Sequence, residues 1–468
     1  MRGAHLDGMS HPSGKTRTRS PAPPPNPGPS ADDYLEAFLT LLPPRVIQRL
    51  ARETGFVQRH RKLDPVAFLY TLAFETGPQL QRTVEALRDA YNKRVPDPIL
   101  SMGGFHERFT PELVEFLRRC VAYALAQLRT APVNRLTPKL ARFTDLRIQD
   151  STVIRPFAAL AQFYPPTRLA KNTRSNRTAG VKVATLFSAR ANGPARLELF
   201  PETTSEIDTL KIGPWVKGSV VLTDLGFYKH QGFARIEENG GFFLSRLKGN
   251  ANPVLIRSHL VHRGRAIDIE GKRWSEVAPR LHRDLLDTEV ELSFPRRAYR
   301  GRHRGDTLRA RLVAVWDEEH RMYHAYVTNL PVDVLSAEEV AELYRTRWSV
   351  ELLFKEAKGL FHLDRVATGN RSVAESLIWT SWLALLVSRR GHNLLLEHKP
   401  PEERFRYPPL RWSRVFRDES REFLTPLLRR TGRRKVIPEP IDELVGRLEV
   451  RARDPNITRE RFREGWFG

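Results

Sequence analysis

The sequence contains a single cysteine, Cys120, among 468 residues. One cysteine cannot form an intrachain disulfide, so a reducing environment is expected and the core alone must hold the fold. Long hydrophobic runs are also missing: the longest, residues 377–387, includes Thr380 and Ser381 and is too short to span a bilayer. The first residues show no apolar segment of the kind that secretory signals carry. We therefore expect a soluble, cytoplasmic protein with no membrane partner.

Acidic residues are too few to balance the basic ones. The chain has 77 lysines and arginines against 54 aspartates and glutamates, which gives a formal net charge of +23 at pH 7. Such an excess suits a polyanionic partner such as double-stranded DNA. Generic solubility, or a genome that favours arginine, would produce the same excess, so charge alone leaves both explanations open.

Motifs of several enzyme classes are absent. The sequence has no HExxH, no paired CxxC, no GxSxG and no dinucleotide-binding glycine fingerprint. Residues 13–16, Ser-Gly-Lys-Thr, match the end of a phosphate-binding loop, but the first glycine of that loop is replaced by Met9 and Pro12 lies inside it. We reject this segment as a nucleotide site. The histidines lack metal-ligand spacing and are interpreted as surface or core residues.

Composition and periodicity predict a disordered N-terminal tail, followed by a helical domain, and a second helical region at the C-terminal end. Residues 1–30 are rich in proline, serine and glycine and are expected to be disordered. Residues 31–143 repeat apolar side chains at i, i+3 and i+4, which predicts an all-helical N-terminal domain. Within it, residues 84–94 and 99–109 form either a helix-turn-helix or part of a plain bundle. Residues 401–468 are interpreted as a basic helical C-terminal region.

The periodicity of the middle of the chain predicts an α/β fold. Residues 144–248 give three strands, a helix, a strand, a helix and a strand, and residues 335–400 return as helices. This is the order of a ribonuclease-H-like mixed-sheet core, in which the first and fourth strands are neighbours. Asp150 is expected at the end of the first strand and Asp224 at the end of the fourth, so the two carboxylates should face each other.

Residues 249–334 alternate with a period near two and predict a β-rich insertion that interrupts the core. An arginine-rich run inside it, residues 296–311, is either a solvated loop or a contact to the DNA backbone, and we favour the contact because arginine suits phosphate. Trp274 and Trp316 are either base-stacking residues or buried sheet aromatics, and the second interpretation is favoured for each.

One long helix carries the most informative polar pattern. Ser336 and Glu339 form a capping box and Gly359 is a plausible stop, which predicts a helix of about 22 residues. Four polar side chains lie within about 60° on one face of that helix: Tyr344, Arg347, Glu351 and Lys358. A carboxylate between two cations and a phenol suits metal and phosphate better than a core, although an exposed helix with i,i+4 ion pairs is the alternative.

The spacing Tyr-x2-Arg-x3-Glu-x6-Lys of these four residues is similar to the signature of the bacterial DDE transposases of the insertion sequence 4 family. The sequences Asp150-Ser-Thr and Asp224-x-Gly-Phe also resemble that family. The resemblance implies that Asp150, Asp224 and Glu351 are the catalytic residues and the metal ligands. Their carboxylate oxygens would hold two Mg²⁺ or Mn²⁺ ions, because ions of this hardness prefer oxygen ligands.

The same resemblance implies that Tyr344, Arg347 and Lys358 contact DNA, and that the helical N-terminal domain is DNA-binding. It further implies a transposase that cuts and rejoins double-stranded DNA at the ends of its mobile element and in a target, as a homodimer in the synaptic complex, in association with the bacterial nucleoid.

Two other functions remain open. A structure-selective ribonuclease-H-like nuclease would share the core, but the large insertion and the Tyr-Arg-Glu-Lys face disfavour it. A catalytically silent DNA-binding regulator derived from a transposase would share the fold, but it would not need all three acids.

Overall fold

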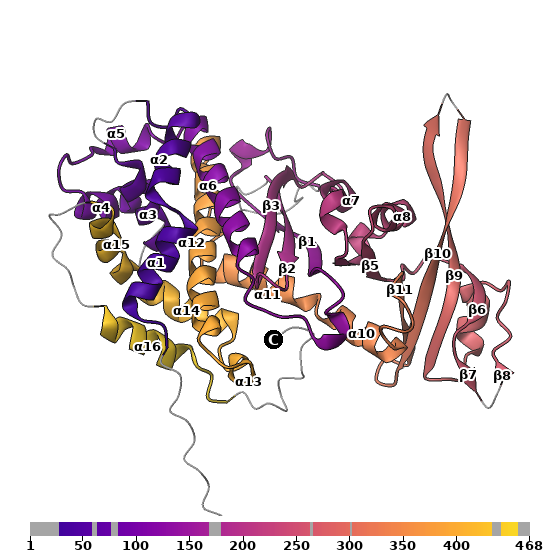
Figure 1. Cartoon of the computed structure of the whole chain (residues 1–468). Helices are drawn as coiled ribbons and strands as arrows, with labels where there is room; N and C mark the ends of the chain where they lie inside the picture. The colour runs from indigo at the N-terminus through magenta and orange to yellow at the C-terminus, as the bar shows by residue number, and fades with distance from the viewer. Residues whose placement is uncertain are drawn as a thin grey trace, which may run out of the picture.

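A computed structural model of the chain describes residues 28–58, 63–75, 83–167, 179–262, 265–299, 302–432 and 441–456. Of the tail predicted to be disordered, residues 1–30, only residues 28–30 are among the described residues. The end of the C-terminal region, residues 457–468, also lies outside them. The fold is mixed α/β with one large sheet, as predicted, and a helical lobe beside it (Figure 1).

The sheet has nine strands in the order β3-β2-β1-β4-β5-β11-β10-β9-β6. Its first half consists of β1 (Leu146–Ile154), β2 (Val181–Ser188), β3 (Gly193–Pro201), β4 (Val220–Thr223) and β5 (Phe242–Arg246). β2 is antiparallel to both β1 and β3, whereas β4 runs parallel to both β1 and β5. The prediction that the first and fourth strands are neighbours is therefore confirmed.

The insertion continues the same sheet. Its strands are β6 (Val254–Ser258), β9 (Leu285–Tyr299), β10 (Arg302–Asp317) and β11 (Met322–Thr328), and all of their pairings are antiparallel. β11 pairs with β5 at Tyr326 and Arg246, so the insertion adds strands to the sheet edge beyond β5. A separate two-stranded sheet joins β7 (Val261–His262) and β8 (Arg265–Ala266). β9 and β10 extend past the rest of the sheet as a long twisted hairpin (Figure 1).

Short helical elements connect these strands. They are η1 (Pro138–Leu140), η2 (Ala158–Leu160), α7 (Glu206–Thr209), η3 (Pro214–Val216), η4 (Leu225–Phe227), α8 (His230–Glu238), α9 (Trp274–Val277) and η5 (Ala278–Arg280).

The helical lobe combines both ends of the chain with one central helix. From the N-terminal side come α1 (Ala31–Leu41), α2 (Pro44–Glu53), α3 (Pro65–Phe74), α4 (Val84–Arg94), α5 (Met102–His106) and α6 (Pro111–Thr130). From the C-terminal side come α12 (Arg371–Glu397), α13 (Pro401–Arg404), α14 (Pro409–Glu419), η6 (Ser420–Phe423), α15 (Leu424–Arg430) and α16 (Asp442–Ala452). None of the described helices is long and apolar enough to cross a membrane.

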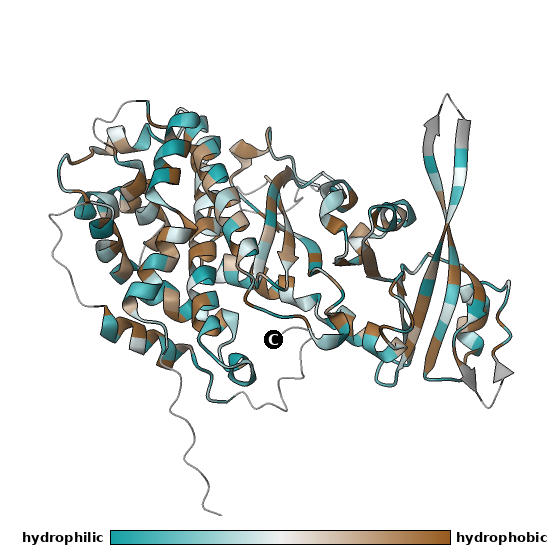
Figure 2. Ribbon diagram, viewed as in Figure 1, coloured by the Kyte–Doolittle hydropathy of each residue, from teal (hydrophilic) through white to brown (hydrophobic). Residues whose placement is uncertain are grey.

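Residues 372–397 are apolar enough in sequence to predict a helix that packs back over the sheet, and α12 differs from that prediction. Its main partners are α1, α3, α6 and α14. Most of its residues are buried, and its Trp382 is fully buried, as expected for a helix with neighbours all round. The hydrophobic interior of this lobe is visible in Figure 2. The two ends of the chain meet there: Tyr34 stacks on Trp412 at 6.2 Å between ring centroids, and Phe38 meets Phe423 at 5.4 Å.

The described residues do not form the helix-turn-helix that the sequence left open. α5 has only five residues, and its Phe105 is fully buried. A recognition helix needs several exposed turns to enter a groove, so the plain-bundle interpretation fits this segment.

The prediction of a single helix of about 22 residues between Ser336 and Gly359 is wrong in one respect. The capping box of Ser336 and Glu339 is present, but the helix is divided into α10 (Ala337–Arg345) and α11 (Trp348–Gly359). The Thr346 hydroxyl donates to the Leu343 carbonyl at 2.6 Å, and the Thr346 and Arg347 amides bond three residues back instead of four. Such local bonds compete with the α-helical pattern and tighten the chain into a turn.

Candidate active site

Asp150 and Asp224 lie side by side on adjacent parallel strands. Gln149 of β1 is paired with Thr223 of β4, so the next residue of each chain segment is an aspartate at the same level. Neighbouring strands are about 4.8 Å apart. Asp224 follows the end of β4 as predicted, whereas Asp150 lies inside β1, which continues to Ile154. The prediction of a strand end was wrong for Asp150, because Ser151 to Ile154 go on pairing with β2.

The turn between α10 and α11 brings Arg347 and Glu351 to this pair. Nη2 of Arg347 donates to Oε1 of Glu351 at 2.6 Å, and Nη1 of Arg347 lies 3.6 Å from Oδ2 of Asp150. One guanidinium thus joins the acid on β1 to the acid on α11. The Glu351 side chain keeps 33 % of its exposure and Arg347 keeps 17 %, so the cluster opens to solvent on one side.

The electrostatics of the site are those of crowded acids. Burial raises the pKa of Asp150 to about 6, while the Ser151 amide and Arg347 lower it and the charges of Asp224 and Glu206 raise it further. The Ser151 N–H donates to Oδ1 of Asp150 at 2.7 Å. Because Asp150 resists losing its proton at this buried position beside other acids, a cation bound among the carboxylates would stabilise its ionised form.

Tyr344 lies on α10, so it does not share a helix face with Glu351 and Lys358 as predicted. The side chain is buried, and its hydroxyl donates to the Thr223 carbonyl at 3.3 Å, one residue before Asp224. Burial, with the nearby charge of Asp224, raises the pKa of this phenol. In this structure Tyr344 fastens α10 to the end of β4.

Lys358 is half-buried near the end of α11 and points at β1. Its Nζ donates to the Val153 carbonyl at 3.1 Å. Burial lowers its pKa, and the charge of Asp364 opposes that change. Lys358 therefore bonds a carbonyl of β1 that is three residues beyond Asp150. Two of its three N–H donors are left for other partners.

The donor set suits a hard divalent cation, because Asp150, Asp224 and Glu351 offer only carboxylate oxygens. Their ligand atoms are not all within 4.8 Å of one another; among the described residues one group of three meets that limit, Asp317, His320 and His324. Sequence reasoning missed this group, although the spacing Asp-x2-His-x3-His could have indicated it.

The Asp317 group is a hydrogen-bonded network in this structure. His324 Nε2 is 2.7 Å and His320 Nδ1 is 2.9 Å from Oδ2 of Asp317. Arg246 Nη2 donates to Nδ1 of His324 at 3.1 Å, which leaves the proton of that ring on Nε2. A metal would need a lone pair on Nε2, so the arrangement does not favour an ion there.

The arginine-rich run of the insertion serves the fold in part. Arg311 is buried and forms a two-pronged ion pair with Asp287, at 2.6 and 2.8 Å, so the prediction of DNA contact is wrong for this residue. Arg296 binds both Glu238 and Asp306. Arg304 and Arg309 are exposed.

Both tryptophans of the insertion pack on Tyr323, at 4.9 Å for Trp316 and 6.4 Å for Trp274. Trp316 also donates its indole N–H to Glu318 at 2.6 Å. Trp316 lies in β10 and is partly buried, which agrees with the favoured interpretation as a sheet aromatic. Trp274 is partly buried at the start of α9, so that interpretation is wrong for Trp274.

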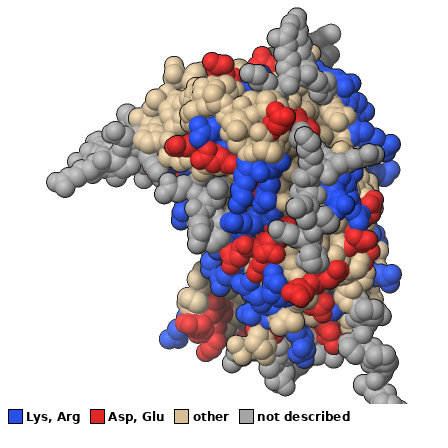
Figure 3. Space-filling model, turned by 90° about the vertical axis from the view of Figure 1, so that its left-hand side faces the viewer, with Lys and Arg blue, Asp and Glu red and all other residues tan. Residues whose placement is uncertain are grey.

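The basic residues of the C-terminal helices are largely paired. Arg447 of α16 lies 3.3 Å from Glu422 and 3.7 Å from Glu419. Arg451 is also bound to Glu419. On the face of the helical lobe seen in Figure 3, basic and acidic side chains are interleaved. No uniformly basic surface stands out on that face.

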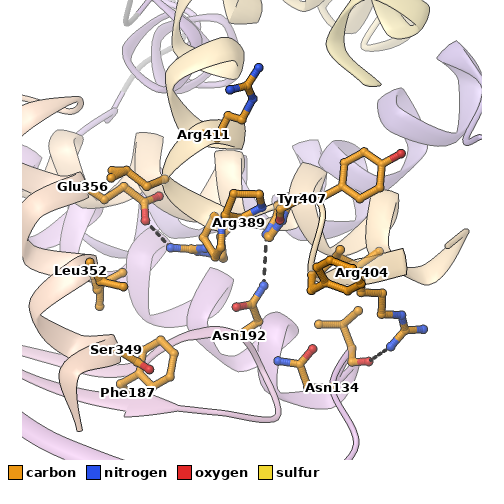
Figure 4. A pocket seen from close by; sticks show the side chains of 18 of the residues that line it. Asn134, Phe187, Asn192, Ser349, Leu352, Glu356, Arg389, Arg404, Tyr407 and Arg411 are labelled. Carbon is orange, nitrogen blue, oxygen red and sulfur yellow. Dashed lines mark hydrogen bonds and ion pairs between the residues drawn. The ribbon is translucent and has the colours of Figure 1, made fainter. Parts of the chain in front are cut away.

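A cavity of about 1350 Å³ lies on the other side of α11 (Figure 4). Ser349, Leu352 and Glu356 of α11 line it, together with residues of α12, α13 and α14. Glu351 does not line it, nor do Asp150 and Asp224. α11 therefore separates this cavity from the carboxylate cluster.

The chain is similar in sequence to several known transposases. The transposase for insertion sequence element IS231F of Bacillus thuringiensis subsp. israelensis is 23 % identical over 406 residues, which is 79 % of this chain and 82 % of that protein. The transposase for element IS231C of Bacillus thuringiensis subsp. berliner is 22 % identical over 390 residues, 74 % of this chain and 77 % of that protein. The putative transposase InsL for element IS186A of Escherichia coli (strain K12) is 45 % identical over 58 residues, 12 % of this chain and 16 % of that protein.

Among solved structures, a cryo-EM structure of the piggyBac transposase synaptic complex with hairpin DNA matches with a TM-score of 0.41 and 9 % identity, over 92 % of this chain and 88 % of that one. The model of the family described as "Transposase DDE domain" matches residues 142–387, which include Asp150, Asp224 and Glu351. Because that match covers more than half of this chain, the chain belongs to the transposase DDE domain family.

Proposed function

We propose that Asp150, Asp224 and Glu351 form the catalytic centre of this DNA transposase, and that it cuts and rejoins DNA at the ends of its mobile element. The observation that carries the proposal is the parallel pairing of β1 with β4, which sets Asp150 beside Asp224, together with the turn that ties Glu351 to Asp150 through Arg347. Three acids far apart in the sequence thus come together where β4 ends beside β1.

We further propose that the chain is of the insertion sequence 4 type, with a ribonuclease-H-like core. The spacing Tyr-x2-Arg-x3-Glu-x6-Lys, the order of the first five strands and the position of the insertion after β5 support this. A DNA-binding role for residues 31–143 and a homodimer in the synaptic complex are parts of the same proposal.

Each acid has a role that follows from its position. Asp150 is adjacent to Asp224 and is linked to Glu351 through Arg347, and it would hold both metal ions, with Asp224 and Glu351 holding one each. Two Mg²⁺ or Mn²⁺ ions, when bound, would activate the attacking water or 3′-hydroxyl and stabilise the leaving oxygen. Burial first, and then the charges of Asp224 and Glu206, raise the pKa of Asp150, and a pair of bound cations would favour its ionised form.

The cations of the signature would position the DNA strand. The guanidinium of Arg347 has five N–H donors, and its bonds to the acids leave donors for a phosphate. Lys358 would hold a second phosphate with its remaining donors. A contact between Tyr344 and DNA would require its hydroxyl to leave the Thr223 carbonyl.

Strand joining is the experiment that tests this function. The purified chain is incubated with a duplex that carries the element's ends and flanking DNA, with a supercoiled target plasmid, in Mg²⁺ or in EDTA. We expect the flank to be released and the ends to be joined to the plasmid in Mg²⁺ only. Cleavage without joining would contradict the proposal in favour of a nuclease, and binding without cleavage would contradict it in favour of a regulator.

A further inference from the structure

A fourth carboxylate, that of Glu206, lies beside the proposed catalytic acids. Glu206 is the first residue of α7, which follows β3, and Ser205 is the N-cap of that helix. α7 packs against η4, the turn that begins directly after Asp224. The side chain is partly buried between the segments that carry Asp150 and Asp224.

One oxygen of Glu206 is held by the residue that also holds Asp150. The Ser151 hydroxyl donates to Oε1 of Glu206 at 3.0 Å, while the Ser151 amide donates to Oδ1 of Asp150 at 2.7 Å. Ser151 therefore joins the two carboxylates through two separate donors. A change in the position of Glu206 would be transmitted to Asp150 over a single residue.

The other oxygen of Glu206 occupies the space of a missing side chain. An ideally placed Cβ on Gly226 would lie 1.4 Å from Oε2 of Glu206. The backbone φ of Gly226 is not in the left-handed region, so space and not conformation calls for glycine here. The glycine two residues after Asp224 thus makes room for an acid from another element.

We propose that Glu206 is a positioning residue of the metal site, which orients Asp150 through Ser151 and adds a fourth negative charge that favours divalent cations. The inference rests on the proposed roles of Asp150 and Asp224. Groups that orient metal ligands by hydrogen bonds commonly change metal affinity by 10- to 100-fold when they are removed.

Mn²⁺ binding to the full-length protein without DNA tests the inference apart from activity. Free Mn²⁺ is measured by electron paramagnetic resonance with wild type, Glu206→Gln, Asp150→Asn and a matched control, Glu202→Gln. The control removes one acidic charge from the loop between β3 and α7, where Glu202 is bound to Arg155 at 2.6 Å. We expect Glu206→Gln to weaken Mn²⁺ binding by on the order of tenfold and Glu202→Gln to leave it unchanged.

The outcomes separate this inference from the function beneath it. Wild-type affinity in Glu206→Gln together with weak binding in Asp150→Asn would overturn the role of Glu206 alone. Wild-type affinity in Asp150→Asn would overturn the proposed catalytic acids and this inference with them.

Gly226→Ala provides an independent test that keeps the net charge. In the wild-type background the new methyl group must displace Glu206, so Mn²⁺ binding should fall about as far as in Glu206→Gln. In a Glu206→Ala background the space is free, and Gly226→Ala should cause no further loss. An equal loss in both backgrounds would assign the effect to the turn at Asp224 and contradict the inference.

Discussion

Two glutamates of α11 each pair with an arginine, and the two pairs differ in burial and in their surroundings. Glu351 and Arg347 keep 33 % and 17 % of their side-chain exposure, whereas Glu356 and Arg389 keep 2 % and 3 %. The first pair lies beside Asp150 and opens to solvent. The second pair lies at the lining of the cavity, where Ser413 also donates to Glu356 at 2.5 Å.

The difference separates an acid available for chemistry from an acid required by the fold. Glu356 has a full set of partners inside the protein, and although burial raises its pKa, Arg389 and Ser413 lower it. Glu351 has one protein partner and room for another ligand. Two glutamates five residues apart on one helix thus have opposite expected responses to mutation.

The largest expected effect is the loss of DNA cleavage when an acid of the proposed catalytic centre is removed. Asp150→Ala or Asp224→Ala should abolish cleavage of element ends, because each removes a metal ligand, while binding to the same DNA remains. Cleavage and electrophoretic mobility are measured side by side. Cleavage at the wild-type rate in either variant would remove that residue from the catalytic set.

The next largest effect is on stability at the buried pair. Glu356→Ala leaves the Arg389 charge without its partner and should cost about 3–5 kcal/mol in the free energy of unfolding. The double variant Glu356→Met with Arg389→Met should recover most of that loss. Urea denaturation measures both. A fully stable Glu356→Ala protein that no longer cleaves DNA would place Glu356 in the chemistry and break the comparison.

Asp150→Asn should stabilise the metal-free protein in a pH-dependent way. The folded protein keeps the Asp150 proton up to about pH 6, against an ordinary value of 3.8. The contribution of this group to stability is therefore present at about pH 4 and lost as the pH rises through 6. Asparagine has no proton to lose, so the variant should gain up to about 3 kcal/mol over wild type at pH 8 and nothing near pH 4.

Thermal unfolding in EDTA across this pH range measures that difference. An Asp150→Asn variant that is equally stable or less stable than wild type at pH 8 would contradict the raised pKa that burial and the neighbouring acids give Asp150.

The smallest effect concerns Tyr344. Tyr344→Phe removes a hydrogen bond to the buried Thr223 carbonyl and should cost about 1 kcal/mol of stability with little change in DNA affinity. Tyr326→Phe is the matched control, because its ring touches Tyr344 and no described residue bonds its hydroxyl. Unchanged stability with weaker DNA binding would instead assign Tyr344 to the DNA.

Much of this site follows from local patterns in the sequence. Alternation located β1, apolar runs located β4 and β5, and the order of the strands predicted that Asp150 and Asp224 are neighbours. The capping box predicted where α10 begins. These features depend on residues close in sequence, or on a strand order that few connections allow.

The rest depends on contacts between distant segments. The division at Thr346 follows from a side-chain bond that competes with the backbone, which helical periodicity does not reveal. Burial of Tyr344 depends on β4, and the position of α12 depends on helices from both ends of the chain. Glu206 was overlooked because its neighbours, Ser151 and Gly226, are brought to it only by the sheet.

Cleavage of a duplex with the element's own ends, by wild type and by Glu351→Ala in Mg²⁺ or EDTA, tests the central claim most directly. The account predicts release of the flank by wild type in Mg²⁺ alone, with DNA binding retained by the variant. Release of the flank by Glu351→Ala at the wild-type rate, or by wild type in EDTA, would contradict it.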